Sequence, residues 1–397
     1  MALTFEEARA CVLAKARRGS GTESVGTLAA SGRVIAENIV ADRDYPPFPR
    51  SARDGFAVRA VDLPGELEII GEVRAGQVFS GSIGAGEAVE IMTGAPMPQG
   101  SDAVVMVEHS TRADTRMNAV RIERALERGD NFAPQGSEAR SGAVILKAGR
   151  RVGFAETALL AMVGRECVQV FRKPRVAILP TGDELVEAAE RQPEPFQIRN
   201  SNAWSLAAQV ERAGGVPEIL PIARDNYEST RSLIDRGLDA DLLLLSGGVS
   251  AGKYDIVEKV FADMGTEFFF DRVKIQPGQP LVFGSVRDRQ FFGLPGNPGS
   301  TMVTFEVFAR AAVELLGGAN EAPLPLLRAR LTRPFHHKPG LTRFLPARLS
   351  LDGSTIAPEA WQGSGDVAAL ARANAFLVAD ADRESWEEGE DIRVLLK

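Results

Sequence analysis

Three short segments of the sequence combine glycine with hydroxyl or carboxylate residues, as ligand-binding loops do. They are residues 181–184 (TGDE), 246–250 (SGGVS) and 295–300 (PGNPGS). Glycine lets the backbone approach a ligand closely, and free N–H groups at the start of a following helix favour an anion, particularly phosphate. The second segment lacks the GK[ST] ending of a Walker A loop and is not a GxGxxG motif. We expect these loops to bind an anion, with a simple acidic turn as the alternative for residues 181–184.

Carboxylate side chains accompany these loops. Asp183 and Glu184 belong to the first loop, Asp225 ends an expected strand, and Asp255 lies at the start of an expected helix. Hard cations such as Mg²⁺ prefer oxygen ligands and phosphates. The four carboxylates are therefore a candidate cation site, with helix N-capping as the alternative for Asp225 and Asp255.

Two further turns carry polar residues in a separate, β-rich part of the chain. One contains Asp54 (SARDG) and the other contains Thr93 (MTGAPMP). Both fit ordinary turns, and a turn-forming role for Asp54 competes with a functional one.

An alternation of apolar strands and amphipathic helices positions the first three loops. Near-continuous apolar strands between such helices are typical of a parallel sheet covered on both faces. In such sheets ligands bind beyond the carboxyl ends of the strands, which is where these loops lie. The expected strands are 174–180, 216–222, 241–247, 267–274 and 280–285, and the expected helices are 201–213, 227–237, 253–264 and 298–316.

The rest of the chain indicates additional domains. Thr4 and Glu7 predict a capping box for a helix over about 4–18, and a second helix is expected over 155–163. Short β-prone runs separated by glycine-rich turns fill the inserted region and the C-terminal region. We predict a multidomain α/β plus β protein with a doubly wound, mainly parallel sheet. The predicted domains are a mixed α/β linker domain (1–45 and 138–172), an inserted β domain (46–137), an α/β domain (173–318) and a C-terminal β domain (319–397).

Composition excludes several classes of function. The 397 residues carry a net charge of −7, which argues against a general nucleic-acid or anionic-membrane surface. Two cysteines far apart and three histidines leave little for a zinc site, a disulfide framework or histidine-based catalysis. The N-terminus has no apolar segment of a signal peptide, and no apolar run approaches the length of a membrane span. We expect a cytoplasmic protein.

Five motifs in a fixed order carry a family resemblance. SARDGFA, MTGAPMPQGSDAVV, PTGDEL, LSGGVSAGKYD and GLPGNPGS resemble the molybdopterin molybdenumtransferase family, the MoeA and gephyrin E-domain group. The resemblance implies an elongated homodimer whose α/β domain binds molybdopterin, with the site between the α/β domain of one subunit and parts of the other. It also implies the last step of molybdenum cofactor synthesis, in which adenylylated molybdopterin and molybdate react, with Mg²⁺, to give the cofactor and AMP.

The resemblance also implies roles for single residues. Expected catalytic residues are Asp225, Asp255, Asp54 and Glu138, the last standing where the family usually has aspartate. Expected Mg²⁺ ligands are Asp183, Glu184, Asp225 and Asp255. Residues expected to bind the molybdopterin substrate or molybdate are Thr93, Thr181, Gly182, Asp183, Glu184, Ser246, Gly247, Gly248, Val249, Ser250, Pro295, Gly296, Asn297, Pro298, Ser300, Arg343 and Ser364, of which Arg343 and Ser364 resemble the oxyanion contacts.

One segment departs from the family pattern. Many members carry lysines in a KPGKP segment, whereas this chain has Gln276 and Gln279. Glutamine donates hydrogen bonds to an oxyanion without the charge assistance that strengthens them. Lys253, Lys274 and Arg343 are candidates to compensate.

Two other functions are alternatives: a molybdopterin adenylyltransferase, whose single α/β domain resembles residues 173–318, and a non-catalytic molybdopterin-binding scaffold. Possible partners are the adenylyltransferase and the molybdoenzymes that accept the cofactor. The sequence leaves open whether tungstate replaces molybdate.

Overall fold

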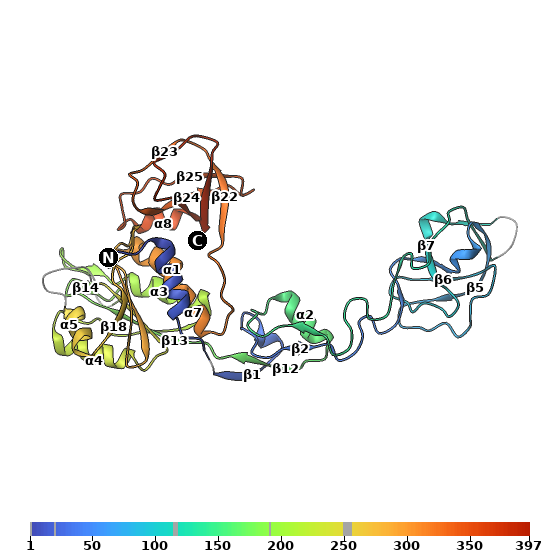
Figure 1. The fold of residues 1–397 in the computed structure, drawn as a ribbon, viewed down its shortest axis with the longest axis horizontal. Helices are drawn as coiled ribbons and strands as arrows, with labels where there is room; N and C mark the ends of the chain where they lie inside the picture. The colour runs from blue at the N-terminus through green and yellow to red at the C-terminus, as the bar shows by residue number, and fades with distance from the viewer. Residues whose placement is uncertain (1, 20, 114–117, 190–191, 249–255) are drawn as a thin grey trace. The chain divides into compact units, whose positions relative to one another are not determined.

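The computed structural model describes residues 2–19, 21–113, 118–189, 192–248 and 256–397 of the chain (Figure 1). The chain forms two compact units. Unit 1 contains residues 1–36, 149–153 and 168–397, and unit 2 contains residues 37–148 and 154–167. The chain therefore passes between the units at four places, after residues 36, 148, 153 and 167.

The central sheet of unit 1 has the strand order β16-β13-β17-β21-β20-β18. Four neighbouring strands, β16, β13, β17 and β21, are parallel, and β20 runs antiparallel to β21 and β18. The predicted mainly parallel sheet is confirmed. The strands are β13 (Arg175–Pro180), β16 (Val216–Ile219), β17 (Leu242–Ser246), β18 (Glu267–Phe270), β20 (Val282–Val286) and β21 (Arg289–Leu294).

Helices cover both faces of this sheet, as predicted (Figure 1). Successive residues of β17 point to opposite faces. Leu244 packs in the core that contains α3 and α6 to α7, and Leu243 packs in the core that contains α4 and α5. The helices are α3 (Asn202–Ala213), α4 (Tyr227–Gly237), α5 (Ile256–Asp263), α6 (Pro298–Thr304) and α7 (Arg310–Leu316).

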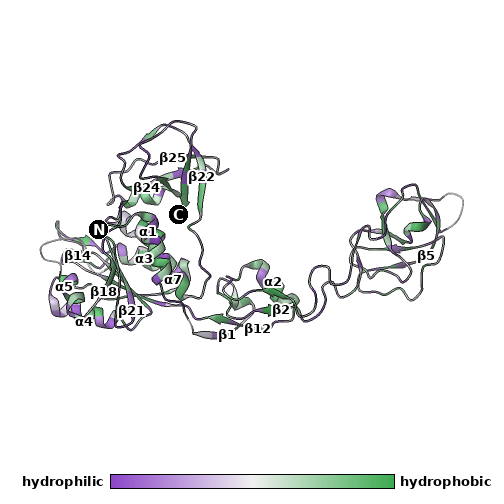
Figure 2. Ribbon diagram, in the orientation of Figure 1, coloured by the Kyte–Doolittle hydropathy of each residue, from purple (hydrophilic) through white to green (hydrophobic). Residues whose placement is uncertain are grey.

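The hydropathy of the residues agrees with this arrangement of helices and strands. Figure 2 shows hydrophobic residues along the central sheet, and its inner strands β13, β17 and β21 are buried on both faces. Among the residues that the structure describes, no helix is both long and apolar enough to cross a membrane.

Strand β21 is not among the strands expected from the sequence, although it lies inside the sheet. It follows β20 through a two-residue turn, Arg287-Asp288, and Val286 pairs with Arg289 across it. Both turn residues have positive φ, 47° and 62°, as a tight hairpin turn requires. The usual signal for this turn is Asn-Gly or Asp-Gly, so the hairpin is hidden in the sequence.

The predicted helix over 298–316 contains a π-helical turn. This turn, η4 (Phe305–Ala309), separates α6 from α7. Such turns admit one extra residue per turn and occur often near functional sites.

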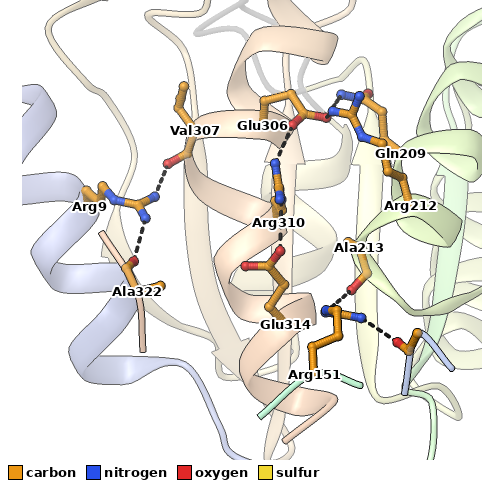
Figure 3. A network of polar contacts seen from close by, with 11 residues as sticks. Arg9, Arg151, Gln209, Arg212, Ala213, Glu306, Val307, Arg310, Glu314 and Ala322 are labelled. Carbon is orange, nitrogen blue, oxygen red and sulfur yellow. Dashed lines mark hydrogen bonds and ion pairs between the residues drawn. The ribbon is translucent and has the colours of Figure 1, made fainter. Parts of the chain in front are cut away.

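Glu306 in this turn is buried and paired. Its carboxylate lies 2.6 Å from a guanidinium nitrogen of Arg212 and 3.3 Å from one of Arg310, and it accepts a hydrogen bond from Gln209 Nε2 (2.7 Å; Figure 3). A buried carboxylate destabilises a fold unless such partners are present. The pairs therefore hold α3 against the helix that starts at residue 298.

The N-terminal helix and a C-terminal sheet complete the core of unit 1. Helix α1 (Phe5–Lys15) begins with the predicted capping box, in which Glu7 N–H donates to Thr4 Oγ1 (3.2 Å) and Thr4 N–H donates to Glu7 Oε2 (2.8 Å). Phe5 packs edge-on against Phe344 of the C-terminal sheet, with ring centroids 5.4 Å apart.

In the C-terminal sheet, strands β24, β25, β22, β28 and β26 pair in a closed ring, and β19 adds to β24. The elements are β19 (Ile275–Gln276), β22 (Leu326–Leu331), β24 (Thr342–Leu349), β25 (Thr355–Pro358), α8 (Val367–Arg372), β26 (Ala375–Ala379) and β28 (Asp391–Leu396). Three further pairs of strands are small. They are β14 (Leu185–Val186) with β15 (Ile198–Arg199), β23 (Phe335–His336) with β27 (Ser385–Trp386), and β1 (Thr22–Gly26) with β12 (Cys167–Phe171). A short 3-10 helix, η1, spans Leu28–Ala30.

Unit 2 is built on a sheet of order β7-β4-β6-β5-β9-β8. Its buried faces form two apolar clusters, one around Phe56 and Val105 and one around Val89 and Val104. The elements are β2 (Ile39–Val40), β3 (Arg50–Ser51), β4 (Gly55–Val58), η2 (Ala60–Asp62), β5 (Gly65–Val73), β6 (Glu87–Ile91), β7 (Ala103–Met106), η3 (Val107–His109), β8 (Thr111–Arg112), β9 (Ala119–Ile122), β10 (Phe132–Ala133), β11 (Val144–Leu146) and α2 (Phe154–Met162).

Candidate functional site

Three loops start side by side at the carboxyl edge of the central sheet. Pro180, Ser246 and Leu294, the last residues of β13, β17 and β21, are neighbours in the register of the sheet. Thr181 N–H donates to the Ser246 carbonyl oxygen (3.1 Å), and Gly247 N–H donates to that of Leu294 (3.2 Å). The glycine-containing loops singled out in the sequence therefore meet, because the parallel strands end together.

Two glycines of the second loop pack against Thr181. Gly247 has φ +95°, and a Cβ atom there would lie 2.8 Å from the Thr181 carbonyl oxygen. Gly248 has φ +64°, and a Cβ there would lie 2.8 Å from Thr181 Oγ1. The close approach and the left-handed backbone both require glycine. Val249 and Ser250, also predicted to bind ligand, lie outside the described residues.

Asn202 connects the second and third loops. It is the first residue of α3, and its Nδ2 donates to Ser246 Oγ (2.9 Å) and to the Gly296 carbonyl oxygen (2.7 Å). Asn200, two residues earlier, accepts a hydrogen bond from Ala203 N–H through Oδ1 (3.2 Å). The two asparagines thus fix the start of α3 against the loops.

A cavity of about 60 Å³ lies between these groups. Thr181 Oγ1, Asn200 Nδ2 and Asn202 Oδ1 are buried and have no hydrogen-bond partner among the residues that the structure describes. Buried polar atoms are nearly always hydrogen-bonded in folded proteins, so three unpaired ones on residues that line one cavity make this edge a candidate ligand site. The cavity is lined by Thr181, Glu184, Leu185, Ile198, Arg199, Asn200, Ser201, Asn202, Ser246, Gly247, Gly296 and Pro298.

Asn200 and Asn202 are not among the site residues predicted from the sequence. The tripeptide Asn200-Ser201-Asn202 stands just before the expected helix, where asparagine and serine are ordinary capping residues. The available signal was position: this helix start belongs to the same edge as the glycine loops. A pair of asparagines there was a candidate for ligand contact.

Two of the predicted acidic residues, Asp183 and Asp225, are brought together. Asp183 Oδ1 accepts a hydrogen bond from Asp225 N–H (3.0 Å). The Arg224 guanidinium donates to the carbonyl oxygens of Gly182, Asp183 and Leu185 (3.4, 3.2 and 3.0 Å) and so braces this loop. Both carboxylates belong to exposed residues at the sheet edge.

The structure tests the N-capping alternative for Asp225 but not for Asp255. Asn226, and not Asp225, caps α4, because its side chain accepts from Ser229 N–H (2.8 Å). Asp255 lies outside the described residues. In the part of the chain that is described, no group of three or more His, Cys, Asp or Glu side chains is placed to hold a metal ion. Mg²⁺ usually binds one or two carboxylates together with substrate phosphates, and the neighbouring Asp183 and Asp225 fit that arrangement.

A second group of polar residues lies on segments that are linked to the other end of the third loop. Gln276 of β19 and Arg343 of β24 are register partners on adjacent parallel strands. Arg343 Nε is buried and unpaired within the described part of the chain. Gly299 N–H donates to the Ser364 carbonyl oxygen (2.7 Å). The loop of residues 295–300 therefore reaches Asn202 at Gly296 and the C-terminal segment at Gly299.

Ser300 and the glutamine segment also lie near this group. Ser300 is buried at the start of α6, and a Cβ on Gly278 would lie 3.6 Å from its carbonyl oxygen. Gly278 stands between Gln276 and Gln279. Four segments, at residues 276–279, 299–300, 343 and 364, are thus linked by these contacts. The predicted oxyanion contacts of Arg343 and Ser364 stay predictions.

The remaining predicted site residues lie in unit 2, where Asp54 and Thr93 form a closed pair. Asp54 Oδ1 accepts hydrogen bonds from Thr93 N–H (2.6 Å) and from Thr93 Oγ1 (2.7 Å). The backbone N–H of Thr93, followed by its hydroxyl, lowers the pKa of Asp54 below its ordinary value. These contacts are those of the turn-forming alternative, and the functional roles of both residues stay predictions.

Glu138, the third candidate in unit 2, is also paired. Its Oε1 lies 2.7 Å from Arg50 Nη2, and both side chains are about half exposed. Surface ion pairs of this kind contribute little to stability. The predicted catalytic role of Glu138 stays a prediction.

Three family models match the chain in succession. The model described as the MoeA N-terminal region (domain I and II) matches residues 3–164. The model described as a probable molybdopterin binding domain matches residues 177–315, and the MoeA C-terminal region (domain IV) matches residues 328–397.

Curated relatives and solved structures agree with these matches. A molybdopterin molybdenumtransferase of Bacillus subtilis is 36% identical and covers 92% of this chain and 87% of its own length. One of Staphylococcus epidermidis is 33% identical and covers 92% and 88%. A crystal structure of molybdopterin biosynthesis moeA protein from Pyrococcus horikoshii OT3 superposes with a TM-score of 0.82 at 28% identity, over 100% of each chain. Another structure of a molybdopterin biosynthesis moea protein gives 0.74 at 32% identity, over 100% of this chain and 99% of that one.

Proposed function

The chain belongs to the molybdopterin molybdenumtransferase family, and on this basis we propose that it inserts molybdate into adenylylated molybdopterin with release of AMP. Its general role is in molybdenum cofactor biosynthesis. The observation that supports the specific reaction is the meeting of three glycine-containing loops beside unpaired buried polar atoms. Arg343 lies in register with Gln276, whose segment approaches Ser300 at Gly278.

The loops at the strand ends would hold the phosphate groups of the substrate. Gly247 and Gly248 lie close to Thr181, and only glycine permits this backbone path. Backbone N–H groups in such a loop donate hydrogen bonds to an anion without the need for a charged side chain. Positioning and electrostatic stabilisation of this kind supply most of the rate in phosphoryl chemistry, where no protein nucleophile is needed.

Asp183 and Asp225 would hold Mg²⁺ together with the substrate phosphates, and Glu184 and Asp255 are further candidates. A bound Mg²⁺ neutralises and polarises a phosphoanhydride. The chain contributes the rigidity of this site, because Arg224 donates to three carbonyl oxygens of the loop that carries Asp183.

Arg343, Ser364, Ser300 and Gln276 would hold molybdate. Arg343 supplies the positive charge and an unpaired buried N–H. Gln276 lies beside it in register and would donate through its amide. Placing the oxyanion and the phosphates at opposite ends of residues 295–300 would bring molybdate near the dithiolene sulfurs of the substrate.

The test is molybdate-triggered release of AMP by the purified protein supplied with adenylylated molybdopterin and Mg²⁺. The wild-type chain is expected to release AMP only when molybdate is added. Asp225→Ala is expected to lower that rate roughly 100-fold while the melting temperature stays unchanged, since Asp225 is exposed.

Asp239→Ala is the matched control, because Asp239 is an exposed aspartate that precedes β17 and so lies at the opposite edge of the sheet. Equal rates for Asp225→Ala and Asp239→Ala would remove Asp225 from the mechanism. AMP release without molybdate, or transfer of adenylate from ATP to molybdopterin, would contradict the proposed reaction and favour an adenylyltransferase.

We also propose that the protein acts as a homodimer and exchanges substrate and product with the adenylyltransferase and with molybdoenzymes. A mass of two chains in light scattering is the expected result. A monomer with full activity would contradict the homodimer.

A further inference from the structure

We infer, on the basis of the proposed function, that Thr301 is a positioning residue for the phosphate groups of the substrate. Its hydroxyl holds the loop of residues 295–297, which precedes α6, in the shape that leaves backbone N–H groups free to bind them. Thr301 itself lies within α6 and has no exposed surface. It therefore acts through the loop and does not contact the substrate.

The contacts of the Thr301 hydroxyl differ from those of an ordinary helical threonine. Threonine inside a helix commonly donates to the carbonyl oxygen four residues earlier, and Thr304 Oγ1 donates to that of Ser300 (2.8 Å) in this way. Thr301 Oγ1 lies 3.1 Å from the corresponding carbonyl oxygen of Asn297 but 2.5 Å from that of Pro295. The shorter contact thus reaches beyond the helix into the loop.

The other two carbonyl groups of the loop are also held by hydrogen bonds. The Gly296 carbonyl oxygen accepts from Asn202 Nδ2 (2.7 Å). The Asn297 carbonyl oxygen accepts from Thr301 N–H (3.0 Å). Donors from two helices, α3 and α6, therefore fix the direction of three successive carbonyl groups, and the Thr301 hydroxyl is the donor for the first.

Fixing the carbonyl groups also fixes two N–H groups. In a planar trans peptide unit the carbonyl and the N–H of the next residue point in opposite directions. The N–H groups of Gly296 and Asn297 therefore point away from α3 and α6, and neither donates to any residue that the structure describes. Both residues are exposed, whereas Pro295 is buried. Successive backbone N–H groups of this kind bind the oxygens of phosphates.

The two free N–H groups adjoin the second loop of the sheet edge. A Cβ atom on Gly296 would lie 3.7 Å from Gly247 Cα, so the two backbones run close together. Gly299 N–H is already donated to the Ser364 carbonyl oxygen (2.7 Å), and the two prolines of this segment have no N–H. Gly296 and Asn297 are thus the backbone donors that the segment 295–299 keeps for the substrate.

The experiment compares Thr301→Val with Thr304→Val in the full chain. Both threonines are fully buried in α6, and each variant replaces a hydroxyl that donates to a backbone carbonyl by a methyl group of similar size. Both melting temperatures are expected to fall, because each variant loses one buried hydrogen bond. Only Thr301→Val releases a carbonyl of the loop, so Thr304→Val is the matched control.

Calorimetry then measures the binding of inorganic pyrophosphate, a probe that carries a diphosphate without the pterin or the nucleoside. Thr301→Val is expected to bind it roughly tenfold more weakly than the wild type, and Thr304→Val is expected to bind it as the wild type does. The KM for adenylylated molybdopterin should rise by a similar factor in Thr301→Val with little change in kcat, since the loop binds phosphates before and during the reaction. Thr301→Ser keeps the hydroxyl and is expected to restore binding.

Three results would overturn the inference: no binding of pyrophosphate to the wild-type chain, equal affinities of Thr301→Val and Thr304→Val, or binding by Thr301→Ser as weak as that by Thr301→Val. Failure of the proposed function gives a different result. In that case pyrophosphate binding would still depend on the Thr301 hydroxyl, but the wild-type chain would release no AMP when molybdate is added.

Discussion

The carboxyl edge of the central sheet and the turn around Asp54 are both rich in hydroxyl, carboxylate and glycine residues. They differ in how their polar atoms are paired. At the sheet edge, Thr181 and two asparagines keep buried atoms without partners in the described part of the chain. At the turn, the Asp54 carboxylate accepts both the N–H and the hydroxyl of Thr93.

This difference distinguishes residues that can bind a ligand from residues that stabilise a loop. An unpaired buried polar atom destabilises the free protein, so its presence indicates a gain elsewhere, which a ligand supplies. A carboxylate that accepts two local hydrogen bonds already stabilises its own turn. Sequence motifs alone do not separate the two cases, because both loops carry the same residue types.

The largest expected effect tests the backbone path at the sheet edge. Gly247→Ala would place a Cβ 2.8 Å from a backbone oxygen at φ +95°, so the loop must shift. Displacement of a binding loop by about 1 Å costs roughly 100-fold in rate, and AMP release is expected to fall by that factor. Gly265→Ala is the control, because Gly265 also has positive φ (+71°) but no atom lies within 4 Å of its Cβ position. A rate loss of equal size in both variants would show that backbone strain, and not the loop path, matters.

The next effect tests an unpaired hydroxyl. Thr181→Val keeps the shape of a buried side chain and removes its polar atom. The free energy of unfolding of the ligand-free protein is expected to rise by about 1 kcal/mol, while affinity for adenylylated molybdopterin falls roughly tenfold. Calorimetry and equilibrium binding measure the two quantities. Loss of stability without loss of affinity would place Thr181 among the loop-holding residues.

Thr93→Val makes the same substitution in the paired turn. It removes a hydroxyl that donates to Asp54, so stability is expected to fall, by a melting-temperature change of about 1–3 °C because the pair is exposed. The sign is opposite to that for Thr181→Val. A variant with unchanged melting temperature and lower turnover would instead support the predicted contact between Thr93 and the substrate.

The smallest effect is on proton binding at Asp54. Its pKa is lowered in the folded state, so the unfolded chain binds the proton more readily and the stabilising contribution is present above the ordinary value of 3.8. That contribution is lost as the pH falls through the folded-state pKa. In Thr93→Val the backbone N–H of residue 93 remains, so NMR titration is expected to show a pKa between that of the wild type and the ordinary value. An unchanged pKa would mean that the hydroxyl does not stabilise the carboxylate.

The sequence was sufficient to predict the elements that have strong periodicity and the loops between them. β13, β17, α3 and α4 follow from apolar runs and helical spacing, and the meeting of the loops follows from the parallel direction of the strands. Strand β21 was missed because its turn, Arg287-Asp288, has positive φ at both residues but lacks the glycine that usually marks such a turn.

The missed site residues have another physical cause. Asn200 and Asn202 resemble helix caps in sequence, and Asn200 does accept a hydrogen bond at the helix start. What the sequence does not show is which amide atom of Asn202 remains unpaired, because that is decided by Ser246 and Gly296, more than 40 residues away along the chain. Such long-range pairing is invisible to local spacing.

The chain crosses between the two units four times, and this limits how the units can be separated. Gly149 N–H donates to the Ile35 carbonyl oxygen (2.8 Å), so the two ends of residues 37–148 lie side by side. Excising that segment would still leave α2 behind without the rest of its unit, because residues 154–167 return to unit 2. A single protease cut leaves the units covalently joined, and complete separation requires four. An isolated unit 2 must therefore be expressed as residues 37–167, a segment that includes residues 149–153 of unit 1.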